Sequence, residues 1–69
     1  MRLSARNQLD GTVASVHHGA VMSTVTIRLE GGQEVVAAIT KDSAESMGLA
    51  DGDAVKAIIK ATEVIVAKD

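Results

Sequence analysis

The sequence predicts a mostly β protein with one short helix, and three observations carry that prediction. Runs rich in Val, Ile and Thr recur along the 69 residues, and β-branched side chains of this kind favour strands. Clusters containing Gly, Asp and Glu separate these runs, as turn residues separate strands. One stretch, residues 41–47, instead carries the signals of helix ends.

A hairpin is predicted over residues 21–40. Residues 21–29 alternate between apolar and polar side chains, which is the pattern of a half-buried strand. One face of this strand is predicted to carry Val21, Val25, Ile27 and Leu29, and the other Met22, Thr24, Thr26 and Arg28. Residues 30–33 include two glycines and are predicted to form the turn, and residues 34–40 return as the second strand.

The other elements follow from local signals. Residues 11–18 are predicted as an earlier strand that ends at Gly19, while the segment before residue 11 stays ambiguous. Asp42 with Glu45 three residues later has the spacing of a capping box, and Gly48-Leu49 fits a Schellman ending, so a helix is predicted over 41–47. After a turn at 50–53, residues 54–60 and 63–67 are predicted as strands. Five strands with one helix between the third and fourth is the order of an OB-type barrel.

Length and composition predict a single small domain, residues 1–69, that associates with copies of itself. A chain this short buries only about 60% of the surface that its unfolded form exposes. It has no cysteine, so neither a disulfide nor a thiolate metal site can add stability. Oligomerisation is then the remaining way to stabilise so small a domain. No apolar run approaches the roughly 18 residues of a membrane span, and the N-terminus lacks a signal-peptide core. We therefore expect a cytoplasmic protein with no membrane partner.

Several function classes fit this composition poorly. The net charge is −2 and aromatic residues make up 0% of the chain, whereas single-stranded nucleic acids are bound through basic grooves and aromatic platforms. His17 and His18 are adjacent in a strand and point to opposite faces, so one metal cation cannot easily take both. Neither histidine has a carboxylate nearby to orient it as a base. The sequence predicts no nucleic-acid partner, no metal-cation site, no catalytic cofactor and no enzyme.

Two segments near the chain ends combine donors that suit a small tetrahedral anion. In residues 4–8, Ser4 offers a hydroxyl and Arg6 a guanidinium with paired N–H groups; the alternative is a solvated N-terminal arm. In residues 60–62, Lys60 and Thr62 flank turn N–H groups that can point at one spot. The alternative there is an ordinary turn with a solvated lysine.

A third segment, residues 40–43, lies at the start of the predicted helix, where unpaired N–H groups favour an anion. Simple capping by Thr40 or Asp42 is the alternative. Capping is the role we favour for Asp42, because its negative charge would repel an oxyanion. Thr40, Lys41 and Ser43 remain free for either task.

These segments belong to a wider set of matching motifs: Ser4-Ala5-Arg6-Asn7-Gln8 with Gly11, Gly19-Ala20-Val21, Ile39-Thr40, Gly48-Leu49, Gly52-Asp53 and Lys60-Ala61-Thr62. The set covers essentially the whole chain and resembles the molbindin family, the Mop-type proteins also described as the molybdate-binding class of the TOBE domain. The resemblance implies an OB-like barrel whose strands are exchanged between two chains. It also implies dimers that assemble into a hexamer and bind molybdate, or tungstate, between subunits.

Carried over residue by residue, the resemblance implies that one side of the interfacial site is formed by Ser4, Arg6, Lys60, Ala61 through its backbone N–H, and Thr62. The partner chain would contribute either Gly19, Ala20 and Val21 or the helix start at Thr40 and Ser43. A second site near a threefold axis would use His18, Lys41 and Ser43. The implied role is storage or buffering of molybdate, and the rival hypothesis is an oligomerisation module that binds no physiological anion.

Overall fold

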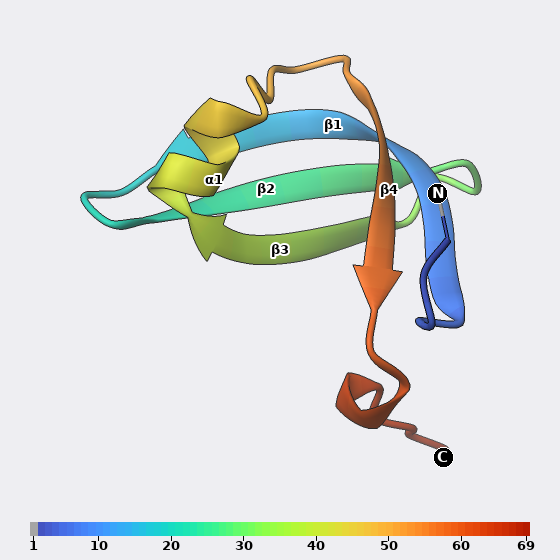
Figure 1. The fold of residues 1–69 in the computed structure, drawn as a ribbon. Helices are drawn as coiled ribbons and strands as arrows, with labels where there is room; N and C mark the ends of the chain where they lie inside the picture. Colours follow the sequence, from blue (N-terminus) through green and yellow to red (C-terminus); the bar gives the residue numbers. More distant parts are fainter. Residues whose placement is uncertain (1) are drawn as a thin grey trace.

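The computed structural model describes residues 2–69 and contains one curled antiparallel sheet with one short α-helix (Figure 1). Four strands form this sheet in the order β3-β2-β1-β4. The elements, in chain order, are β1 (Asn7–His18), β2 (Met22–Leu29), β3 (Glu34–Thr40), α1 (Lys41–Ser46), β4 (Ala54–Ile59) and the 3₁₀ helix η1 (Ala61–Glu63). The predicted mostly β fold with one helix is confirmed.

The hairpin of β2 and β3 matches the prediction except at its first residue. Val25 and Ile27 are buried as the alternation predicts, and the turn closes with Gly32 at a φ of 91°. Val21 was expected on the buried face, but it precedes β2 and is 71% exposed. The first buried residue of this face is Ser23, which is only 1% exposed, and its hydroxyl lies 2.7 Å from Nδ1 of the His18 ring, so it is satisfied.

β1 is longer than predicted because it belongs to two ladders. Its C-terminal part pairs with β2 as far as His18↔Ser23, and its N-terminal part pairs with β4 from Asn7↔Ile59 onward. The ladders overlap at Gly11 and Thr12, and an added Cβ at Gly11 would lie 2.6 Å from Cγ2 of Ile27. Only glycine permits this close approach, so the sheet curls here around the core of Val13, Val25, Ile27 and Ala57.

The helix α1 has the predicted ending but a different cap. Thr40 is the N-cap, since its hydroxyl oxygen accepts a hydrogen bond from the Ser43 N–H at 3.1 Å. The capping role favoured for Asp42 is therefore wrong, because Asp42 lies one residue inside the helix, in its first turn. Gly48 with a φ of 61° and the bond from the Leu49 N–H to the Ala44 carbonyl complete the predicted Schellman ending.

The predicted fifth strand, residues 63–67, is wrong for the single chain. After β4, the helix η1 turns the chain away from the sheet, and residues 64–69 pair with no strand among residues 2–69 (Figure 1). A β-forming composition makes no strand unless an adjacent edge accepts its hydrogen bonds. The sheet is thus a half-open barrel of four strands, and the closed five-stranded barrel expected from the element order is not formed within one chain.

The open side of the half-barrel is an apolar groove. It has a volume of about 960 Å³ and is lined mostly by apolar side chains from β2, β3 and β4, together with Met47 and Leu49, and Asp10, Lys60 and Glu63 complete the lining. The tail beyond η1 is also apolar and lies in solvent, with Val64, Ile65 and Val66 51%, 92% and 87% exposed. None of the helices formed by residues 2–69 is both long and apolar enough to cross a membrane.

Candidate functional site

The pairing of β1 with β4 brings two of the predicted segments to one end of the sheet. The last pair of this antiparallel ladder is Asn7↔Ile59. Arg6 directly precedes Asn7, and Lys60 directly follows Ile59. The N-terminal arm, residues 2–6, and the turn at 60–62 therefore lie next to each other, although more than fifty positions separate them in sequence (Figure 1).

The arm carries its predicted donors in solvent and is tied to β1 by a side chain. Ser4 and Arg6 are exposed, and Ala5 between them is half-buried. The Gln8 side-chain amide donates a hydrogen bond of 2.9 Å to the Ala5 carbonyl. Residue types at 4–8 gave no reason to single out Gln8, because a contact three residues apart within an arm of unknown conformation leaves no periodic signal.

The turn at 60–62 leaves backbone donors unused. Within η1 and its cap, the N–H groups of Glu63 and Val64 donate to the carbonyls of Lys60 and Ala61 at 2.9 and 3.3 Å. The N–H groups of Ala61 and Thr62 have no backbone acceptor in the described part of the chain. They are therefore free to donate to a bound group, as the first N–H groups of any helical turn are.

The two predicted cations of this site, Arg6 and Lys60, are not neutralised by carboxylates. Among residues 2–69, the ion pairs join Arg28 to Glu34 at 2.8 Å and Lys56 to Asp10 at 2.7 Å. Neither Arg6 nor Lys60 has a carboxylate within salt-bridge distance in that range. Exposed hydroxyl, N–H and cationic donors without a bound counter-charge can chemically accommodate a small anion.

The remaining predicted residues gather at the opposite end of the sheet, around the turn between β1 and β2. The Lys41 N–H, at the start of α1, donates to the Val21 carbonyl at 2.7 Å, so the helix start adjoins the turn formed by residues 19–21. Thr40 donates its hydroxyl hydrogen to Ser43 at 2.8 Å, which leaves the Ser43 hydroxyl hydrogen available to another acceptor. His18 lies at this end too, bonded to Ser23.

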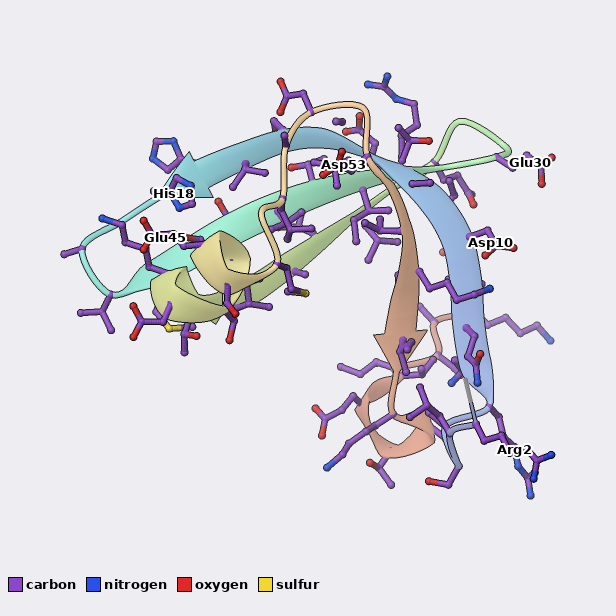
Figure 2. The ribbon with its side chains drawn as sticks, turned by 45° about the horizontal axis from the view of Figure 1, so that its top comes forward. Arg2, Asp10, His18, Glu30, Glu45 and Asp53 are labelled. Atoms are coloured by element: carbon purple, nitrogen blue, oxygen red, sulfur yellow. The ribbon has the colours of Figure 1, made fainter. Side chains whose placement is uncertain are left out.

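One chain cannot bring the two ends together. Figure 2 shows His18 at one end of the sheet and Arg2, on the arm, at the other. β1, with 12 residues, runs from one end to the other, and the chain extends 36 Å along its longest axis, whereas a small anion is held by donors about 3 Å away. The structure thus unites Ser4 and Arg6 with residues 60–62, and residues 19–21 with the start of α1, as two separate groups. Residues 2–69 bring no three His, Asp or Glu side chains together in a metal-ligating cluster.

A half-open antiparallel barrel with this element order defines a known class of small domain. The TOBE domain family matches residues 3–66, and the chain belongs to that family. Molybdenum-pterin-binding protein 3 of Clostridium pasteurianum is 41% identical over 66 residues, which cover 96% of this chain and 97% of that protein. The predicted resemblance to Mop-type proteins is confirmed by this relationship. Some curated relatives are longer, and the chain covers only 24% or 25% of their length.

Solved structures show the same fold. A molybdate-binding protein from Sporomusa ovata has a TM-score of 0.93 and 44% identity, with 99% of this chain and 100% of that chain covered. ModG, described as a cytoplasmic molybdate-binding protein and solved with molybdate bound, has a TM-score of 0.90 and 46% identity. The match covers 94% of this chain and 46% of the ModG chain.

Proposed function

We propose that this protein binds molybdate at sites shared between subunits of a homo-oligomer. One side of each site is formed by Ser4, Arg6, Lys60, the Ala61 N–H and Thr62. The observation that carries this proposal is the β1–β4 register, which places two exposed cations and two unused N–H groups at one end of the sheet with no carboxylate paired to either cation. Relatives with this fold are molybdate-binding proteins by name, and a dianion suits this donor set.

The other side of the site comes from a second chain. The donors at the far end of β1 are too distant to reach the same small anion within one chain. The partner contributes its turn at Gly19, Ala20 and Val21, or the helix start at Thr40 and Ser43, which the Lys41–Val21 hydrogen bond holds beside that turn. Where copies meet at a threefold axis, His18, Lys41 and Ser43 form a second kind of anion site, with the free Ser43 hydroxyl hydrogen as a donor.

Assembly uses the apolar surfaces that the single chain leaves uncovered. The tail at residues 64–67 is exposed, and the groove between β3 and β4 is mostly apolar and open. Exchange of this tail between two chains supplies each half-barrel with its missing fifth strand and removes both edges from solvent. Such dimers, and a hexamer built from them, hold the arm of one chain near its neighbour.

The physiological role that fits these features is storage or buffering of molybdate, and of tungstate where it is present, in the cytoplasm. The relative ModG is described as cytoplasmic, and the donors of the candidate site hold an anion without any nucleophile or base to transform it. The protein is therefore a binding protein and not an enzyme. The rival function is an oligomerisation module whose donors bind no anion.

Native mass spectrometry of the purified protein, with and without molybdate and with a sulfate control, separates these two functions. A hexamer-sized species that gains several molybdates and ignores sulfate supports the proposal. An oligomer of the same size that gains no molybdate leaves the oligomerisation module. A salt-sensitive gel shift with single-stranded oligonucleotides would instead reveal a nucleic-acid partner, and we expect no shift.

A further inference from the structure

We propose that Gln8 is the positioning residue of the oxyanion site, an inference that rests on the proposed function. Its side-chain amide holds the N-terminal arm at the end of β4 and so fixes where Ser4 and Arg6 present their donors. Gln8 itself contributes no atom to the anion in this proposal. Its role is to order the arm before the ligand arrives.

The arm has little else to hold it. No backbone–backbone hydrogen bond joins residues 2–6 to the rest of the chain that the structure describes. The β1–β4 ladder starts only at Asn7, and Leu3, Ser4 and Arg6 are exposed. An arm of this kind samples many conformations unless a side chain restrains it.

Gln8 is placed to supply that restraint. Its backbone is part of the ladder, opposite Ile58, so the base of its side chain is fixed by the sheet. The amide reaches back to the Ala5 carbonyl at 2.9 Å. Because a carbonyl only accepts hydrogen bonds, the side-chain atom facing it is the NH₂ group, and the orientation of the amide is determined.

The position of Ala5 makes this one hydrogen bond effective for both donors. Ala5 lies between Ser4 and Arg6, and its carbonyl belongs to the peptide plane that leads into Arg6. Fixing that plane limits the directions in which the Arg6 side chain can leave the backbone. Binding then loses less conformational entropy, since the arm is already ordered, and affinity rises without an additional contact.

The test compares full-length variants by isothermal titration with molybdate. Gln8→Met keeps the side-chain length and removes the donor, and Gln8→Thr favours a strand but is too short to reach Ala5. Both are expected to weaken molybdate binding by about three- to tenfold, the effect of losing one ordinary hydrogen bond. Thr12→Val is the matched control, because Thr12 is an exposed polar residue of the same strand with no bond to the arm, and we expect its affinity to stay unchanged.

Two readouts separate positioning from general stability. The heteronuclear NOE of the Ser4 and Arg6 amides in ligand-free protein should fall in Gln8→Met, while the melting temperature stays near that of the wild type. In an Arg6→Ala background, Gln8→Met should weaken binding less than it does in the wild type, because part of the Gln8 effect consists of positioning the Arg6 side chain.

Each other outcome is decisive. If Arg6→Ala weakens binding while both Gln8 variants bind like the wild type, the positioning role is overturned and the proposed function stands. If the Gln8 and Arg6 effects simply add, or follow a fall in melting temperature, Gln8 is structural and the inference is again overturned. If the wild type binds no molybdate, the proposed function fails and this inference fails with it.

Discussion

Substitution of Arg6 by alanine tests the site most directly. Arg6 and Lys60 are the two cations assigned to the site at the β1–β4 end, and neither has a carboxylate within salt-bridge distance among residues 2–69. A hydrogen bond to a charged group contributes about 1.5 to 3 kcal/mol, and about 1.4 kcal/mol corresponds to tenfold in affinity. Arg6→Ala should therefore raise the Kd for molybdate by at least about tenfold, and by roughly a hundredfold if the partner chain excludes water from the site.

The assay is isothermal titration at fixed ionic strength, with Arg28→Ala as the matched control. Both variants remove one positive charge, but Arg28 is paired with Glu34 on an exposed surface, and an exposed charge far from the site is screened over a Debye length of about 10 Å at 0.1 M salt. Assembly should survive in both variants, because neither residue lines the apolar groove. An unchanged isotherm for Arg6→Ala, or an equal loss in Arg28→Ala, would refute the assignment of Arg6.

Three further substitutions test the assembly and the fold. Ile65→Asp puts a charge on a tail residue that is 92% exposed in the single chain. Because burying an unpaired carboxylate at a subunit interface is unfavourable, native mass spectrometry should show monomers in place of oligomers. Intact oligomers would mean that the tail is not part of the interface. Gly11→Ala places a Cβ 2.6 Å from Ile27 Cγ2 and 2.8 Å from the Arg28 carbonyl oxygen, so chemical denaturation should show a loss of about 1 to 3 kcal/mol; a wild-type midpoint would mean that the sheet can open there. Val13→Ala removes two buried carbons from a side chain that is 2% exposed and should destabilise the protein by about 2 kcal/mol in the same assay, whereas the exposed Val36→Ala serves as its control.

The sequence predicted the parts of the fold that local patterns determine. Alternation over 21–29, the paired glycines after it and Gly48-Leu49 each correspond to an observed strand, turn or helix end. It placed Val21 inward in error, because alternation does not show where a strand begins, and Val21 lies in the turn before β2. It favoured Asp42 as the cap for a similar reason, since Thr40 and Asp42 are both good capping residues and only the backbone conformation separates them.

The candidate site was predicted less completely than the fold. Residue chemistry alone singled out Arg6 and Lys60, but their proximity depends on the β1–β4 register, which joins the two ends of the chain and leaves no local trace. Gln8 was missed because its importance lies in one contact with Ala5. Residues 63–67 were predicted as a strand from composition, yet a strand also needs a neighbouring edge, and residues 2–69 of one chain leave this segment unpaired.

The separation of the two donor groups along β1 has a genetic consequence. If each shared site takes the arm of one chain and the far turn of another, a variant defective at the arm and a variant defective at the turn damage different halves. In a dimer that contains one chain of each kind, one site receives both defects and the other receives neither. Two inactive alleles expressed together would then restore part of the binding that each lacks alone, which is intragenic complementation.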